Sequence, residues 1–496
     1  MSTARIVVDD AYEIAEIDPR IYGSFVEHMG RGVYDGIYAP EHETADEDGF
    51  RGDVAAVVRE LGPTILRYPG GNFVSGYDWE DGVGPKSERP ERLDLAWRSV
   101  ESNQVGTDEF LRYCRTVQAD PMLAVNLGTR GMREALALLE YCNVPGGTPA
   151  SDLRRRHGTA EPYGVKVWCL GNEMDGPWQL GHKTAEDYGK LAAQTAAAMK
   201  VVDPSIELVA CGSSKPSMPT FARWEATVLE HTYRHVDHVS MHMYADPEKY
   251  QDTADFLAAG LDVDEYIRSV VASVDYARAA GRHSRHLSLS FDEWNVWYNS
   301  RSRDVGHWPH APRLIEDTYS LAHALVVGSF LNSLLRGSDR VRMACLAQLV
   351  NVIAPIRTEP GAGEVWRQTT FFPFALTARY GRGTALQAQV TCERTSTSAH
   401  DDVPLLDVAA VRREDGEHVL FVVNRSTDRP VTAHLDLRGV AADGRTVEHT
   451  CLTGPDLDAT NGPGRPEIAP VVAGRTPLDG EAVELPPGSW SMLRVA

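Results

Sequence analysis

The sequence predicts an α/β protein, a closed (β/α)8 TIM barrel followed by an all-β domain. The prediction rests on two successive patterns of apolar segments along its 496 residues. From about residue 20 to 380, short apolar runs alternate with longer helical patterns, and beyond that point short strand patterns follow one another. Strands of a parallel barrel are buried on both faces, so they appear as continuous apolar runs. A doubly wound open sheet would show the same alternation and is the competing topology.

Eight apolar runs of strand length supply the barrel, and each lies beside polar or glycine residues. Among the helical patterns between them, the clearest runs from Thr184, which opens the capping-box-like sequence TAED, to Val202, and the pair Asp203-Pro204 ends it. The eight runs are RIYGSFVEH (20–28), TILRYPGGN (64–72), PMLAVNLGT (121–129), VKVWCLGNE (165–173), IELVACGSS (206–214), VDHVSMHMY (236–244), LSLSFDEWN (287–295) and RMACLAQLV (342–350).

Beyond about residue 380 the pattern is that of an all-β domain. The pair Asp415-Gly416 separates two strand-like runs, which is a hairpin signature. The segment ARIVVD precedes the barrel without a neighbouring partner, so we expect it to pair with the C-terminal strands. The predicted organisation is an N-terminal strand segment at 1–19, a barrel at 20–380 and a jelly-roll-like β-sandwich at 381–496.

Composition excludes several classes of partner. The 49 Lys and Arg against 70 Asp and Glu give a net charge of −21, whereas nucleic-acid binding needs cations that neutralise phosphates. No run approaches the roughly 20 apolar residues that span a bilayer, and the start MSTARIVVDD lacks the features of a secretion signal. Seven scattered cysteines without a CxxC pair indicate reduced thiols. We therefore expect a cytoplasmic protein that binds neither nucleic acid nor membrane, and its acidic surface is compatible with a neutral substrate such as sugar.

Two carboxylates stand out at the carboxyl ends of the predicted strands, the side of a barrel that carries active sites. Glu173 follows the fourth strand and Glu293 the seventh, 120 residues apart (293 − 173), yet opposed strands can bring them to one sugar ring. Glycoside hydrolysis needs such a pair, one to protonate the leaving oxygen and one to attack the anomeric carbon or activate water. Burial and a like-charged neighbour would keep the acid protonated. The other polar residues at these ends include Glu27, His28, Arg67, Asn72, Asn126, Asn172, His242, Tyr244 and Gln348.

Aromatic residues gather at the same strand ends, and flat ring faces suit the C–H faces of sugars. Each ring could equally pack in the core, although this is less expected for the pair Trp294 and Trp297 beside a carboxylate. The residues concerned are Trp168, Trp178, Trp294, Trp297 and Tyr298.

No metal or cofactor is predicted. His235, His238 and His242 lie close in sequence. On a strand, however, His235 would point away from the other two, because it lies three residues before His238 and only even offsets share a face. No further Cys or His spacing supports zinc. The segment YPGGNF matches neither phosphate-binding glycine motif, so its glycines are expected to form a turn that lets Asn72 reach the pocket.

Three further polar residues could have structural instead of substrate-binding roles. Asn126 either contacts substrate or caps the loop after the third strand. Asp292 should point away from Glu293 by strand alternation, so we expect a structural role. Asp175 is expected in an exposed loop or supporting the site from outside.

Five long segments resemble the signature segments of glycoside hydrolase family 51, the intracellular α-L-arabinofuranosidases. The likeness extends from about residue 20 to 380. It implies a (β/α)8 barrel with a C-terminal β-sandwich, a retaining mechanism, no obligatory cofactor and, commonly, a hexameric homo-oligomer. The segments are RIYGSFVEHMGRGVYDGIY (20–38), LRYPGGNFVSGYDWEDGVGP (66–85), CLGNEMDGPWQLGHKTAEDYG (169–189), SFDEWNVWY (290–298) and ACLAQLVNVIAPI (344–356).

The resemblance also implies roles for single residues. Glu173 matches the acid/base and Glu293 the nucleophile, while Asn172 matches the amide that holds the sugar 2-hydroxyl. The matches to other site residues are Glu27, Asn72 and Gln348 for binding the furanose, Tyr244 and His242 near the nucleophile, Arg67 for keeping it ionised, and Trp297 for bordering the sugar.

One segment departs from the family pattern. In SMHMYADPEKY, Met243 and Ala245 stand where the family's more usual SLHQYYGN-like sequence has polar and aromatic residues. His242 and Tyr244 are kept, so catalysis is expected to persist while the leaving-group side differs.

The expected activity is retaining exo-hydrolysis of terminal non-reducing α-L-arabinofuranosyl residues from arabinan, arabinoxylan and derived oligosaccharides, through a covalent glycosyl-enzyme. The alternatives are β-xylosidase or endoglucanase-type activity on the same scaffold, and a sugar-binding barrel without catalysis. The sequence leaves open the preferred 1,2, 1,3 or 1,5 linkage and the tolerance of doubly substituted xylose.

Overall fold

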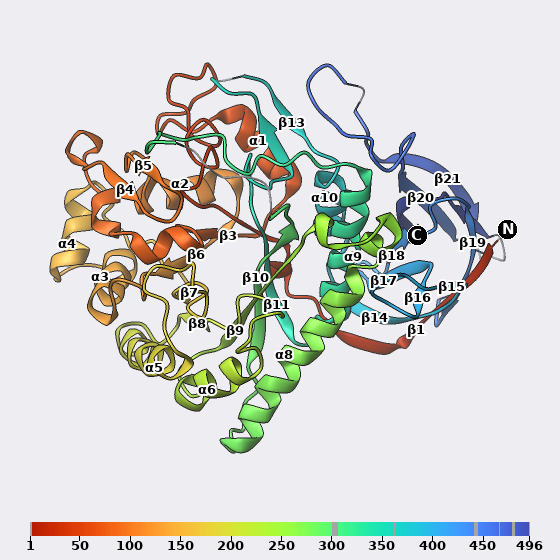
Figure 1. Cartoon of the computed structure of the whole chain (residues 1–496), viewed down its shortest axis with the longest axis horizontal. Coiled ribbons are helices and arrows are strands. Elements are labelled where there is room, and N and C mark those ends of the chain that lie inside the picture. The colour runs from red at the N-terminus through yellow and green to blue at the C-terminus, as the bar shows by residue number, and fades with distance from the viewer. Residues whose placement is uncertain are drawn as a thin grey trace.

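Eight parallel strands close into a barrel, so the predicted closed topology is confirmed and the open sheet is wrong (Figure 1). The computed structural model describes residues 2–299, 306–361, 363–440, 445–465, 467–478 and 482–495. Each of the eight predicted runs contains one barrel strand, and neighbours in sequence are neighbours in the barrel. The strands are β2 (Gly23–Phe25), β3 (Ile65–Tyr68), β6 (Asp120–Val125), β7 (Val167–Leu170), β8 (Glu207–Ala210), β9 (His238–Ala245), β10 (Ser288–Val296) and β11 (Val341–Leu346).

Helices pack around the outside of the barrel. The predicted helix is α5, in which the Thr184 side chain accepts a hydrogen bond from the Asp187 amide at 3.1 Å, and the helix ends at Val202 before Asp203. The described α-helices are α1 (Gly52–Leu61), α2 (Thr107–Val117), α3 (Met132–Asn143), α4 (Pro149–Arg156), α5 (Ala185–Val202), α6 (Arg223–Thr232), α7 (Thr253–Leu257), α8 (Gly260–Ala280), α9 (Leu321–Arg336) and α10 (Phe371–Tyr380). Within the described residues, none of the helices combines the length and apolar character needed to cross a bilayer.

The C-terminal strands form one nine-stranded sheet in the order β21-β20-β23-β18-β17-β14-β1-β19-β22. The predicted hairpin is confirmed, since β17 and β18 pair antiparallel on either side of Asp415-Gly416. The predicted pairing of the first segment is also confirmed, because β1 runs antiparallel to β14 and parallel to β19 (Figure 1, red strand among the blue ones). The strands are β1 (Ser2–Glu16), β14 (Thr384–Thr391), β17 (Leu406–Arg412), β18 (His418–Asn424), β19 (Val431–Arg438), β20 (Thr446–Leu452), β21 (Val471–Pro477), β22 (Val483–Leu485) and β23 (Ser489–Val495).

Both faces of β18, in the middle of this sheet, are buried. On β18, Leu420 and Val422 face a core made only of the sheet's own side chains, whereas Phe421 faces the core shared with the barrel. Val447 of β20 and Val483 of β22, near opposite ends of the strand order, belong to the same inner core, so the sheet curls around it. The predicted all-β domain after the barrel is therefore confirmed, with its strands in one curled sheet. The domain boundaries near residues 19 and 380 stay predictions.

The helix α9 lies between the barrel and the sheet. Its residues Leu321–Leu335 are all buried. A Cβ added at Gly328 would lie 2.4 Å from Cδ1 of Trp490, which is itself fully buried on β23. Only a glycine therefore allows the helix backbone this close to the sheet.

We expect Gly328→Ala to destabilise the protein by about 1–3 kcal/mol, because the added methyl overpacks a buried contact and this outweighs alanine's better helix propensity. The apparent melting temperature measures the effect. Gly474→Ala on the exposed strand β21, where no atom lies within 4 Å of the added Cβ, is the matched control. Its melting temperature should equal that of the native protein. Equal melting temperatures for the two variants would contradict the close packing.

Candidate active site

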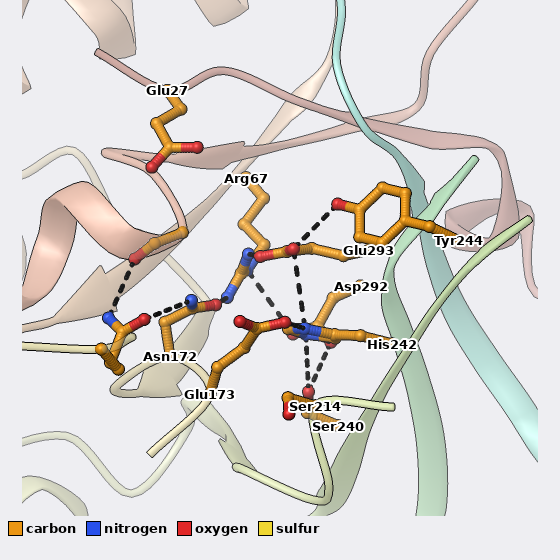
Figure 2. Close-up of polar contacts among 12 residues, drawn as sticks. Glu27, Arg67, Asn172, Glu173, Ser214, Ser240, His242, Tyr244, Asp292 and Glu293 are labelled. Atoms are coloured by element: carbon orange, nitrogen blue, oxygen red, sulfur yellow. Dashed lines mark hydrogen bonds and ion pairs between the residues drawn. The ribbon is translucent and has the colours of Figure 1, made fainter. Parts of the chain in front are cut away.

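Glu173 and Glu293 face each other at the carboxyl ends of the barrel strands (Figure 2). Glu173 follows β7, and Glu293 lies near the end of β10. An oxygen of one carboxylate lies within 4.8 Å of an oxygen of the other. Retaining glycosidases hold their two carboxyl groups about 5–5.5 Å apart, whereas inverting ones leave room for a water between them. The spacing therefore fits direct attack by a carboxylate.

The pair opens into a cavity of about 430 Å³, a size typical of small-ligand sites. Arg67, Asn172 and His242 do not line the cavity. Arg67 and His242 contact the carboxylates, and Asn172 is bound to Arg67. The predicted site residues that line the cavity are Glu27, Asn72, Glu173, Tyr244, Glu293, Trp297 and Gln348.

Arg67, on β3, is the buried cation that organises the site. Its Nη1 donates to Glu293 Oε1 at 2.8 Å, and its Nη2 donates to Asn172 Oδ1 at 2.7 Å. Because the guanidinium occupies the oxygen of the amide, the Asn172 nitrogen is left to donate elsewhere. The contact between Arg67 and Glu293 places a permanent positive charge beside this carboxylate and favours its ionised form.

The expectation that Asp292 points away from Glu293 is wrong. The register of β10 against β9 shifts between Ser290 and Glu293, so simple alternation fails there. Asp292 Oδ2 lies 3.5 Å from Arg67 Nε, and Oδ1 accepts a hydrogen bond from Ser240 at 2.7 Å. Burial raises the pKa of Asp292, but the charges of Arg67 and His242 and the hydrogen bonds from His242 and Ser240 together outweigh it, so the pKa falls below its usual value. Asp292 therefore has a structural role, as expected, which is to pair with the buried Arg67 guanidinium.

His242 joins the three carboxylates. Its Nδ1 lies 2.9 Å from Glu173 Oε1 and 3.6 Å from Glu293 Oε2, and its Nε2 lies 3.2 Å from Asp292 Oδ1. Burial lowers the pKa of His242, but the surrounding carboxylates raise it to about 10, so the ring is an imidazolium at neutral pH.

The cluster of Glu173, His242 and Glu293 has ligand atoms close enough for a cation, all within 4.8 Å. An imidazolium has no lone pair for a metal, however, and both ring nitrogens already face carboxylates. His238 sits at the other end of β9, where its Nε2 lies 2.8 Å from Glu207 Oε2. The chemistry of these residues therefore favours proton transfer over metal binding.

Glu293 is held as a carboxylate on both oxygens. Tyr244 donates to Oε2 at 2.9 Å, while Arg67 occupies Oε1. Burial, the largest effect, and the charge of Glu173 keep the pKa of Glu293 above its usual value, while the charges of His242 and Arg67 and the hydrogen bond from Tyr244 limit that rise. The hydrogen bonds from Tyr244 and Arg67 favour the charged form of Glu293.

The segment GNEMDGPW after β7 forms turns that bring the Trp178 indole to the Glu173 carboxylate. Glu173 has a φ of 42°, in the left-handed region that non-glycine residues seldom adopt and that is common at functional sites. A Cβ at Gly176 would lie 2.5 Å from Trp178, so this glycine lets the ring fold back over the chain. Trp178 Nε1 then donates to Glu173 Oε2 at 2.6 Å.

Trp97 is a site residue that sequence reasoning missed. It lies between the short strands β4 (Arg92–Asp94) and β5 (Ser99–Glu101), far from any barrel strand end in the sequence. Its Nε1 donates to Glu27 Oε1 at 3.0 Å, and Gln348 donates to Oε2 at 3.2 Å. Burial raises the pKa of Glu27 to about 8. Nothing in the sequence around Trp97 distinguishes it from a loop tryptophan.

The remaining expectations have mixed outcomes. Asn126 caps its loop, since Oδ1 accepts hydrogen bonds from the amides of Gly128 and Thr129 at 3.0 Å each. Asp175 supports the next loop by accepting from the Ser214 amide at 3.1 Å. Of the aromatic residues, Trp178 and Trp297 line the cavity, Trp168 and Trp294 are fully buried core, and Tyr298 bonds to His323.

A barrel with a close carboxylate pair at its carboxyl end, one carboxylate held by an arginine and a tyrosine, defines a glycoside hydrolase. Two family models match the chain: the "Alpha-L-arabinofuranosidase 1 domain" over residues 57–260 and the "Alpha-L-arabinofuranosidase C-terminal domain" over residues 292–489.

Known proteins match over the whole length. An intracellular exo-alpha-(1->5)-L-arabinofuranosidase of Acetivibrio thermocellus is 52% identical over 100% of both chains. An exo-alpha-(1->6)-L-arabinofuranosidase of Bifidobacterium longum is 50% identical, covering 100% of this chain and 98% of its own. The solved structure of a family 51 alpha-L-arabinofuranosidase from Bifidobacterium longum superposes with a TM-score of 0.96 at 43% identity, covering 100% of both chains. The chain belongs to the α-L-arabinofuranosidases of glycoside hydrolase family 51.

The raised pKa of Glu27 predicts a pH-dependent stability. The folded protein holds this proton up to about pH 8, whereas the ordinary value is near 4.5, so its stabilisation is present at low pH and is lost as the pH rises to 8. Glutamine cannot ionise. We expect the unfolding free energy of Glu27→Gln, relative to the native protein, to increase between pH 5 and 8 and then level off, by up to a few kcal/mol at about 1.4 kcal/mol per pKa unit.

Chemical denaturation at a series of pH values measures this difference. Glu230→Gln, at an exposed position on α6, is the control and should show no such trend. A constant difference between Glu27→Gln and the native protein across this range would contradict a buried, protonated Glu27.

Proposed function

We propose that this protein is a retaining exo-α-L-arabinofuranosidase in which Glu173 is the acid/base and Glu293 the nucleophile. The observation that carries the proposal is the approach of the two carboxylates to within 4.8 Å, with Arg67 bound to Glu293 alone of the pair. The residue that must attack is thus the one in contact with a permanent cation. The family and the full-length relatives support arabinofuranose as the sugar released.

In the first step, Glu293 attacks the anomeric carbon while Glu173 gives its proton to the leaving oxygen. The glycosidic bond breaks as an ester bond forms between the sugar and a Glu293 oxygen. Arg67 and Tyr244 keep the attacking carboxylate oriented, and His242 holds Glu173 through Nδ1 at 2.9 Å. The Trp178 donor fixes the other oxygen of Glu173.

In the second step, water hydrolyses the ester. Formation of the ester removes the negative charge of Glu293, which lowers the proton affinity of Glu173. Glu173 can then take a proton from water as the water oxygen attacks the anomeric carbon and the ester bond breaks. Two inversions at the same carbon give net retention.

We place the furanose in the part of the cavity next to Glu27 and Gln348. Glu27 and Gln348, hydrogen-bonded to each other, offer acceptors and donors to sugar hydroxyls, and Asn72 and Asn172 add amides. Trp297 packs edge-on against Tyr244 with ring centroids 5.0 Å apart, which places an apolar ring beside the same space. These residues are those that the family resemblance assigns to the sugar.

The linkage, the compartment and the assembly belong to the same proposal. Relatives of almost equal similarity are named for 1->5 and for 1->6 bonds, so we propose arabinan- and arabinoxylan-derived oligosaccharides as the substrate class. Relatives named intracellular support a cytoplasmic enzyme that acts on short oligosaccharides. We also propose a homo-oligomer that needs no cofactor. β-Xylosidase and endoglucanase activity are not favoured by relatives at about 50% identity.

Product analysis by NMR on defined arabinan and arabinoxylan oligomers tests this function. Release of arabinose from non-reducing ends, with the α-anomer formed first, is the expected result. Aryl xyloside and carboxymethyl-cellulose assayed alongside should react far more slowly. An initial β-anomer, or faster turnover of the xyloside, would refute the proposal.

The roles of the two glutamates predict opposite responses to azide. Glu293→Ala should lose turnover by orders of magnitude, and azide entering the vacated space should give the inverted β-arabinofuranosyl azide. Glu173→Ala should keep activity on aryl substrates with good leaving groups, and azide should then give the retained α-azide. NMR of the azide products distinguishes them, and the reverse pattern would mean that the roles are exchanged.

A further inference from the structure

We propose that this hydrolase favours arabinofuranosides whose leaving group carries a carboxylate, as a uronic acid residue does, and that Lys215 and Lys249 bind that carboxylate. The inference rests on the proposed function, because it requires Glu173 to be the acid facing the leaving group. It extends that function by naming a chemical class of substrate.

Both lysines line the catalytic cavity. Lys215 lies in the loop after β8, and Lys249 ends the short helix η5 (Pro247–Lys249) that follows β9. The Lys215 ammonium lies 4.8 Å from the ring centroid of Trp178, whose Nε1 donates to Glu173 Oε2 at 2.6 Å. Since the acid must touch the leaving oxygen, the leaving group has to occupy the Glu173 side of the cavity, and Lys215 borders that side.

The charges of these lysines stand out against the rest of the protein. The chain has a net charge of −21, and three glutamates, Glu27, Glu173 and Glu293, line the cavity. Within the described part of the chain, no carboxylate lies within 4.0 Å of the Lys215 ammonium. Lys249 has only a long contact of 3.7 Å to Asp246, and its side chain is 74% exposed. Both cations can therefore meet an anion on the substrate.

The other residues that line this side of the cavity are uncharged or already paired. Met243, which departs from the family pattern, lines the cavity with a thioether, and Pro216 adds another apolar surface. The Ser214 hydroxyl already lies 3.3 Å from Asp175 Oδ2. Ser217 and Asn299 add neutral polar groups to the lining. Among the described residues that line the cavity, only Lys215 and Lys249 are cationic, so they are the groups that can distinguish an anionic leaving group from a neutral one.

A competing explanation is that Lys215 only packs on Trp178 as a cation–π contact and thereby steadies Glu173. In that case, loss of the lysine would slow neutral and anionic substrates equally. The two explanations therefore differ in how the effect depends on the charge of the leaving group.

The test compares 4-carboxyphenyl with 4-carbamoylphenyl α-L-arabinofuranoside, which have similar shapes and differ in charge. The value of kcat/KM is measured for the native protein, Lys215→Gln, Lys249→Gln and the double variant, because it covers the steps in which the leaving group is still present. We expect the ratio of the carboxylate to the carboxamide substrate to fall by about three- to tenfold in the double variant, the scale of one or two exposed ion pairs. The native preference should also shrink at about 0.5 M NaCl.

Lys166→Gln is the matched control. Lys166 directly precedes β7, at the end of the barrel opposite the site, where its Nζ donates to Ser205 at 2.7 Å. The variant changes the net charge by as much as either single lysine variant and should leave the ratio unchanged. An unchanged ratio in the double lysine variant, or an equal loss on both substrates, would overturn the inference. If the native protein hydrolyses neither substrate, the proposed function itself fails.

Discussion

The whole site depends on one buried guanidinium. Arg67 is almost fully excluded from solvent, yet its charge is matched by Asp292 below it and Glu293 beside it, and its second nitrogen orients Asn172. A buried cation without such partners would be strongly destabilising. The same arrangement that satisfies the arginine also favours the ionised form of Glu293.

The barrel supplies the rigidity that this charge network needs. Arg67, His242 and Glu293 lie on three different strands, and Asn172 and Glu173 follow a fourth, so their distances are set by hydrogen-bonded strand register. The curled sheet packs against α9 with a glycine-to-tryptophan contact and buries its outer face on the barrel. The C-terminal strands thereby stabilise the scaffold, while the site is built from barrel residues.

Much of the fold was predictable because its signals are local and repeated. Eight apolar runs gave eight barrel strands, and the Thr184 cap and the Asp415-Gly416 turn lie where their chemistry predicts. Glu173 and Glu293 could be selected because both follow apolar runs at strand ends. The prediction for Asp292 failed because a register shift in β10 breaks the period-two rule, and such irregularities leave no mark in the sequence.

The sequence by itself determined which residues are available to the site: two acids, an arginine, amides and aromatic rings at the ends of buried strands. Only the tertiary structure decided how charge is distributed among them, since the pKa of each group depends on burial and on neighbours from distant strands. It also decided that Trp97 reaches Glu27 and that Trp178 folds onto Glu173. Loop residues of this kind are placed by long-range packing, for which a linear pattern holds no period.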